Sequence, residues 1–87
     1  MLTMTEAAAG YLTDVLKGAK ASHETAVRLT KKGKGFSSAL DTARPGDITI
    51  AHSGRNVLLM DATTSDILAQ RSLDLRDTPD GPRLQIK

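Results

Sequence analysis

Hydrophobic and polar residues alternate along residues 26–40, and this alternation predicts a β-hairpin at the centre of the chain. One extended run covers residues 26–29 and a second covers residues 36–40, with a lysine- and glycine-rich loop between them. Two period-2 runs around such a loop are typical of a hairpin. Arg28 falls on the outer face of this hairpin, and we expect the apolar positions to face the core: Val27, Leu29, Phe36 and Leu40.

The loop of this hairpin carries three lysines, Lys31, Lys32 and Lys34. Like charges at such spacing repel one another and keep their solvation in water. We therefore expect an exposed, cationic hairpin tip, and the tip with the adjoining Phe36, Ser37 and Ser38 is the first place to look for an interaction site.

A helix is predicted before the hairpin, because apolar residues recur there at helical spacing. Thr5 is a suitable N-cap with Glu6 in the first turn, although Thr3 with Glu6 would form an alternative capping box. Residues 2–5 could pair as an edge strand, and Gly18 with the polar run 20–23 ends the helix. The apolar stripe is expected to face the core, with Tyr11 beside it: Ala8, Leu12, Val15, Leu16 and Ala19.

Residues 43–60 predict a turn and two strands. Pro45-Gly46 suits the central positions of a type II turn, since proline fixes φ and glycine tolerates a positive φ. Ile48 and Ile50 alternate with polar or small residues as in a half-buried strand. Residues 53–56 form the next turn, and the apolar run 57–60 is typical of a central strand.

The last third of the chain predicts a short helix and two more strands. Asp61 can cap a helix that runs through Leu68, with Ile67 and Leu68 as its anchors. Alternation at Leu73 and Leu75 indicates a strand, the dense turn 77–82 follows, and the final strand directs Leu84 and Ile86 inward. This order of elements predicts a single small α+β domain over residues 1–87, with an N-terminal helix, a short second helix and mostly antiparallel or mixed strands.

The composition narrows the chemistry that the chain can perform. Only 39% of the 87 residues are hydrophobic and the aromatic residues are Tyr11 and Phe36, so the core is modest and homodimerisation could complete it. Without cysteine the chain forms no disulfide, thiolate metal site or cysteine nucleophile. It also contains no apolar run of about 20 residues and no signal-peptide pattern, which predicts a cytoplasmic protein without a membrane partner.

The charge is unevenly distributed along the chain. Residues 1–35 hold six lysines and arginines against three acidic residues, whereas residues 36–87 hold six against seven. A basic front half favours weak attraction to anions. The small total charge and the scarcity of stacking aromatics argue against a nucleic-acid binder.

The remaining candidate residues do not form a catalytic or metal-binding pattern. His23 and His52 lie in different elements without ligand spacing, and Ser37 and Ser38 lack the glycines of a nucleophile elbow. Residues 32–38 resemble a phosphate loop only superficially, because the residue order is wrong and no helix follows, although the amides of the loop could hold an anion weakly. Single aspartates at turns and strand faces are typical of solvated positions. We predict no enzyme activity and no cofactor.

Taken together, these segments resemble the A-type iron–sulfur carriers, the HesB-like family. The opening residues 2–9 are similar to that family's Leu-Thr-x-Thr/Ser-x-x-Ala-Ala start, and Gly35-Phe36-Ser37-Ser38 falls where the family has Gly-Cys-Ser-Gly. Further similarities extend the resemblance along nearly the whole chain, at residues 27–29, 46–48, 57–61, 73–75 and 80–86.

The departures from this family concern its cluster ligands. Phe36 stands at the position of the family's first ligand cysteine, and the sequence ends at Lys87, before the family's Cys-Gly-Cys tail. Thiolate sulfur is the ligand that suits iron and iron–sulfur clusters, whereas a phenyl ring cannot ligate. The resemblance therefore implies the HesB-like fold without cluster ligation, with Phe36 filling the space of the missing ligand.

The leading functional hypothesis is a non-catalytic accessory or protein-interaction role, with a protein partner related to iron–sulfur assembly. The alternative is an anion- or nucleic-acid-binding module that uses the tip from Lys31 to Lys34. A third hypothesis, a metal or cluster carrier with histidine and aspartate ligands, receives the least support. The residues assigned to interaction are Lys31, Lys32, Lys34, Phe36, Ser37 and Ser38.

Overall fold

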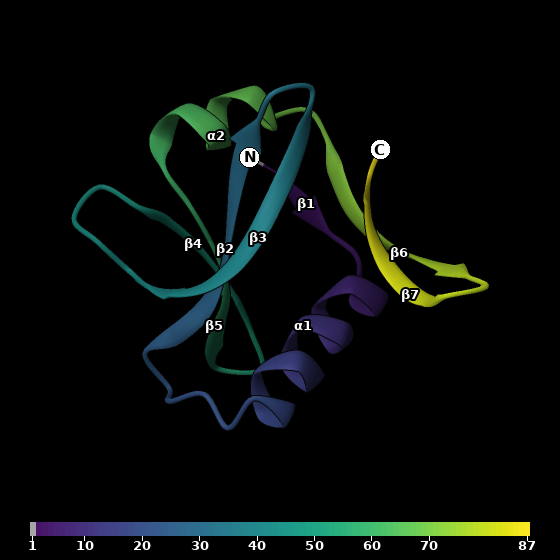
Figure 1. The fold of residues 1–87 in the computed structure, drawn as a ribbon. Coiled ribbons are helices and arrows are strands. Elements are labelled where there is room, and N and C mark those ends of the chain that lie inside the picture. Colours follow the sequence, from purple (N-terminus) through teal and green to yellow (C-terminus); the bar gives the residue numbers. More distant parts are fainter. Residues whose placement is uncertain (1) are drawn as a thin grey trace.

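The computed structural model, which describes residues 2–87, has two β-sheets and two helices (Figure 1), and together they enclose a single apolar core. Neither helix among these residues is long and apolar enough to cross a membrane. The elements follow in the order β1 (Thr3–Met4), α1 (Glu6–Gly18), β2 (Thr25–Lys32), β3 (Gly35–Thr42), β4 (Ile48–His52), β5 (Arg55–Met60), α2 (Ala62–Ile67), β6 (Ser72–Thr78) and β7 (Gly81–Ile86).

The larger sheet has the strand order β3-β2-β5-β4, and the smaller one has the order β1-β6-β7. The pairs β2–β5 and β1–β6 are parallel, and the other pairs are antiparallel. The predicted hairpin is confirmed as β2–β3, and the apolar run 57–60 lies in the central strand β5. The predicted α+β architecture with mixed strands is thus confirmed.

Helix α1 begins at the predicted cap, but its stripe is shorter than predicted. The Thr5 side chain accepts a hydrogen bond from the Ala8 amide at 3.2 Å, which decides between the two capping alternatives. The amides of Lys20 and Ala21 donate to the carbonyls of Lys17 and Leu16, the pattern of a Schellman motif, with Lys20 at a φ of 55°. The prediction for Ala19 was wrong: it is the exposed C-cap residue, beyond the buried face.

Two other residues predicted to face the core are exposed. Leu40 shares the inward face of the sheet with its cross-strand neighbour Val27, yet it is 47% exposed because β3 is an edge strand whose far end no other element of residues 2–87 covers. Ile67 is 46% exposed because α2 directs Thr64 and Leu68, four residues apart, toward the core. The alternation was identified correctly at Leu40, whereas the prediction that Ile67 anchors α2 was wrong in direction, because Ile67 lies on the exposed side of this short helix.

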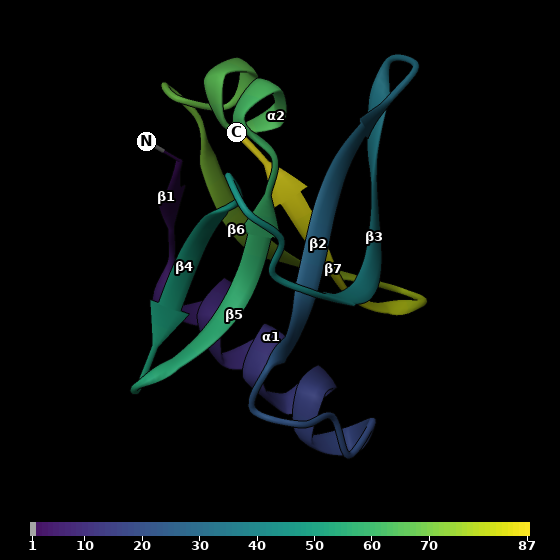
Figure 2. The same cartoon turned by 90° about the vertical axis from the view of Figure 1, so that its left-hand side faces the viewer.

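The segment between β3 and β4 crosses the outer face of the larger sheet (Figure 2). It must pass over β2 and β5, since β3 and β4 lie at opposite edges. The predicted type II turn lies in this segment, directly before β4. The Asp47 amide donates to the Arg44 carbonyl at 3.0 Å, and Gly46 has a φ of 88°. The crossing covers the face opposite the core and leaves the inward face to α1 and the smaller sheet.

Candidate functional site

An open groove of about 590 Å³ lies between α1, the β2–β3 hairpin and the β6–β7 hairpin. Helix α1 contributes Tyr11 and Val15, and the strands contribute mainly aliphatic side chains, including Leu84. Asp80 and Arg83 add opposite charges near the turn that joins β6 to β7. An apolar lining with a few polar groups at its border is typical of a binding surface.

Phe36, Ser37 and Ser38 line this groove, and their role in an interaction stays a prediction. Phe36 is half-buried and packs against the hydrophobic core, which agrees with a ring that fills space. The Lys31 ammonium lies 5.6 Å from the centroid of the Phe36 ring, within the range of a cation–π contact. The Lys31 side chain also donates to the Gly33 carbonyl, so this lysine is held against the hairpin.

The cationic tip is exposed as predicted, and it does not form part of the groove lining. Lys31, Lys32 and Lys34 are all exposed, and none of them lines the groove. Gly33 takes a φ of 58° while Lys34 has a negative φ, as in a type II′ turn. The six residues assigned to interaction therefore form two neighbouring surfaces, the groove wall of Phe36, Ser37 and Ser38, and the lysine tip.

The candidate metal and catalytic residues do not converge. Within residues 2–87, no three histidine, aspartate or glutamate side chains are placed to hold a metal ion. His23 is exposed in the turn before β2, and His52 ends β4. Ser37 and Ser38 lie in β3, and within residues 2–87 neither has a side-chain hydrogen bond to a histidine.

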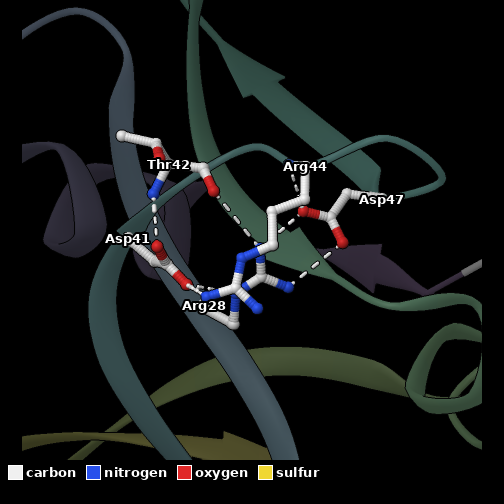
Figure 3. A network of polar contacts seen from close by, with 5 residues as sticks. All are labelled: Arg28, Asp41, Thr42, Arg44 and Asp47. Atoms are coloured by element: carbon white, nitrogen blue, oxygen red, sulfur yellow. Dashed lines mark hydrogen bonds and ion pairs between the residues drawn. The ribbon is translucent and has the colours of Figure 1, made fainter.

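A polar network that the sequence did not suggest lies on the outer face of the larger sheet (Figure 3). The Arg28 guanidinium donates to the Asp41 carboxylate at 2.7 Å and to the Asp47 carboxylate at 3.1 and 2.5 Å. It also reaches the Thr42 carbonyl at 3.3 Å, and the exposed Arg44 donates to Asp41 at 3.0 Å. The network joins β2 to β3 and to the crossing segment, so it holds the fold together.

The same contacts set the charge states of the network. Hydrogen bonds from the Arg28 side chain and from the Arg44 amide lower the pKa of Asp47 to about 2. The Arg28 side chain and the Thr42 amide lower the pKa of Asp41 as well. Hydrogen bonds to these two carboxylates raise the pKa of Arg28. All three groups are therefore charged at neutral pH and satisfied by one another, which suits a structural role rather than proton transfer.

Two further aspartates have similar structural roles. Asp61 caps α2 by accepting from the Thr64 amide at 2.7 Å, and this bond lowers the pKa of Asp61. The Asp74 carboxylate accepts hydrogen bonds from Lys87 and Thr5 at 2.8 Å each. These two contacts, together with a hydrogen bond from the Leu75 amide, lower the pKa of Asp74 to about 2. The predicted cap at Asp61 is confirmed, whereas the expectation of a merely solvated aspartate was wrong at Asp74, as it was at Asp41 and Asp47. Asp61 was recognised as a cap from its place before a helix, whereas the partners of Asp74 are distant in sequence.

Comparison with known proteins identifies the fold but no close relative. No protein-family profile and no curated protein sequence matches the chain. Among solved structures, Escherichia coli SufA, described as involved in biosynthesis of iron–sulfur clusters, is 24% identical with a TM-score of 0.74, covering 99% of this chain and 83% of SufA. IscA with a [2Fe-2S] cluster is 14% identical with a TM-score of 0.70, over 100% of this chain and 84% of IscA. An Aquifex aeolicus protein is 20% identical with a TM-score of 0.70, over 99% and 89% of the two chains. The HesB-like fold expected from the resemblance is therefore confirmed.

Proposed function

We propose that this chain, which has the fold of SufA and IscA, is a cysteine-less member of the A-type carrier family with a non-catalytic, protein-binding role in iron–sulfur protein maturation. The fold similarity and the sequence resemblance both extend over nearly the whole chain. SufA and IscA are the proteins associated with iron–sulfur clusters, and the proposed role of this chain rests on its structural similarity to them.

The residues of the groove do not fit an iron–sulfur cluster. Clusters are held by thiolates, and the chain contains no cysteine. Phe36, where the resemblance places a ligand, is half-buried against the core and lines the groove. An aromatic ring at this position supplies apolar contact area in place of a metal bond. The surface thus favours contact with another protein over ligation of a metal.

The groove itself is the observation that carries this proposal. Side chains from α1, from the central hairpin and from the β6–β7 hairpin meet there around an opening of about 590 Å³. Phe36 and Val15 are half-buried, so part of their apolar surface stays available to a partner. An apolar segment of a partner protein, bordered by polar groups, would bury this surface.

Quantitative affinity capture from an extract of the source cells, read out by mass spectrometry, tests the proposal. The unmodified chain should enrich iron–sulfur assembly proteins or cluster-containing enzymes. Val15→Lys places a charge in the groove and should abolish that enrichment. The matched control is Lys17→Gln, an exposed position on the same helix, which should retain it. Enrichment unrelated to iron–sulfur proteins, or equal capture by both variants, would contradict the proposal.

The alternative function, binding of an anionic partner, draws on the exposed lysine tip. Among the described residues, Lys32 and Lys34 make no ion pair, so their charge is available to an anion. Replacing Lys31, Lys32 and Lys34 with glutamine should change stability by no more than about 0.5 kcal/mol, because all three are exposed. If this triple variant loses a partner whose affinity also falls steeply with added salt, the result supports the anion-binding function and contradicts the groove function.

A further inference from the structure

Strand β3 presents a free edge of the larger sheet. Hydrogen-bonded and non-hydrogen-bonded pairs alternate along an antiparallel ladder, so every second residue of an edge strand directs its backbone groups outward. Thr42 shows which residues these are, because its amide donates to the Asp41 side chain and its carbonyl accepts from Arg28, both outside the ladder. The same parity gives Phe36, Ser38 and Leu40 outward-facing amides and carbonyls.

The other sheet edges carry features that oppose strand pairing. Strand β4 has an irregularity in its register between Ile50 and Ala51, and β1 contains only two residues. Strand β7 carries Pro82 and Arg83 near its start. Bulges, short strands, proline and charge are the usual means of protecting an edge. From Phe36 to Leu40, β3 has none of these features and exposes serine, alanine and leucine side chains.

We propose that two copies of this chain pair through β3, antiparallel and around a two-fold axis at Ser38. In this register Ser38 lies opposite Ser38 of the second copy, and Phe36 lies opposite the second copy's Leu40. All of these residues direct their backbone groups outward, so each pair can form two hydrogen bonds. The two larger sheets then join into one continuous sheet, and the interface is the same on both copies.

The side chains of β3 fit this register. Phe36 and Leu40 lie on the same face of the strand, and Phe36 is half-buried while Leu40 is 47% exposed. Pairing sets the ring of each copy against the leucine of the other, and aromatic–aliphatic pairs on one face stabilise neighbouring strands. The exposed Leu40 at the edge of a single copy would be covered in this arrangement.

The charges also favour an antiparallel pair over a parallel one. Lys34 falls opposite Thr42 of the second copy, which is eight positions from that copy's own Lys34. The two lysine tips are then about 27 Å apart at roughly 3.4 Å per residue, well beyond the screening length of about 8 Å. A parallel, in-register pair would instead stack the two lysine clusters against each other, which is repulsive.

Cysteine cross-linking tests the register, because the chain has no cysteine of its own. Ser38→Cys places two thiols directly opposite, with Cα atoms about 5.5 Å apart as in a hydrogen-bonded pair, within the range of a disulfide. Ser37→Cys is the matched control, since Ser37 is also exposed but lies opposite Ala39 of the second copy. Under mild oxidation Ser38→Cys should form a covalent dimer at least about tenfold faster than Ser37→Cys. Equal rates would overturn the proposed register.

Sedimentation of the cysteine-free chain tests the association itself. One added strand pair is smaller than the roughly 1,200–2,000 Å² of a stable interface, so the dimer should grow with concentration between about 10 μM and about 1 mM. Leu40→Lys should weaken it by about tenfold or more, because a lysine on the edge opposes pairing. Ile67→Lys is the control, since Ile67 is exposed to the same extent on α2 and should leave association unchanged. A monomer throughout, or equal effects of both variants, would refute the proposal.

Discussion

The Arg28 guanidinium binds the Asp47 carboxylate through two nitrogens, with Nη2 2.5 Å from Oδ2 and Nη1 3.1 Å from Oδ1. The side chains of Arg28 and Asp47 are only 13% and 6% exposed. Asp47 belongs to the segment that crosses from β3 to β4, so the pair links this segment to β2 (Figure 3). A contact between residues 19 positions apart thus helps to fix the order of strands in the larger sheet.

The lowered pKa values of Asp47 and Asp74 predict a loss of stability in acid. Both values lie at about 2 in the folded chain, below the ordinary value of 3.8. Since the folded pKa is depressed, the stabilisation is fully present above pH 4 and is lost as the pH falls through about 2. Denaturant titrations from pH 6 to 2 should show this decline. Asp47→Asn combined with Asp74→Asn should flatten it, whereas Asp66→Asn, at an exposed position on α2, should not.

A second prediction concerns the buried face of α1. Leu16 is fully buried in the core, and its truncation removes apolar contacts and leaves a cavity. Leu16→Ala should therefore lower the free energy of unfolding by roughly 2–5 kcal/mol, a large share of the total for a domain of this size. Lys17→Ala, at the next and exposed position, is the control and should have little effect. An unchanged denaturation midpoint for Leu16→Ala would mean that α1 packs by another face.

The local pattern predicted the elements well because each element depends mainly on nearby residues. Alternation located β2 and β3, helical spacing located α1, and Pro45-Gly46 located a type II turn. The failures at Leu40 and Ile67 have different causes. Alternation gave the direction of Leu40 but not whether another layer lies above it, and the short run 62–67 did not show which side of α2 faces the core. That information depends on contacts between distant segments.

In the candidate site, too, the local part could be predicted and the contacts between distant segments could not. Phe36, Ser37 and Ser38 were assigned to interaction from the hairpin alone, and they do line the groove. The opposite walls come from Tyr11 and Arg83, which are far away in the sequence and carry no local signal of such a role. The register of the hairpin could have suggested the contact of Arg28 with Asp41, because Asp41 lies two residues beyond the position directly opposite Arg28. It could not have suggested the contact with Asp47, which lies outside the hairpin.

The C-terminus of α1 gives a third prediction. Lys20 adopts a φ of 55°, a left-handed conformation in which a Cβ atom is unfavourable and glycine is preferred. Lys20→Gly should therefore raise the free energy of unfolding by about 0.5–1 kcal/mol, measured by denaturant titration. The same substitution inside the helix, Lys17→Gly, should lower it by about 1 kcal/mol. A loss of stability in both variants would show that the Schellman motif is not maintained in solution.

The last prediction separates the fold from the chemistry of the proteins that share it. We predict that the purified chain binds neither iron nor an iron–sulfur cluster, because it has no thiolate and its histidines lie in separate elements. After anaerobic reconstitution with iron and sulfide and then desalting, the protein should show no visible charge-transfer absorption and no retained iron. A stable brown protein with stoichiometric iron would contradict this and would require nitrogen and oxygen ligands.

Phe36→Cys makes the same experiment more stringent. One thiolate per chain gives a dimer two sulfur ligands, whereas a cluster usually takes four, so this variant should not recover stable cluster binding. It should also lower the free energy of unfolding by roughly 1–3 kcal/mol, because the ring that packs against the core leaves a void. Ser37→Cys adds a thiol next to this position without removing the ring and serves as the control. If Phe36→Cys alone retained a full cluster, the loss of binding would depend on a single residue rather than on the whole ligand set.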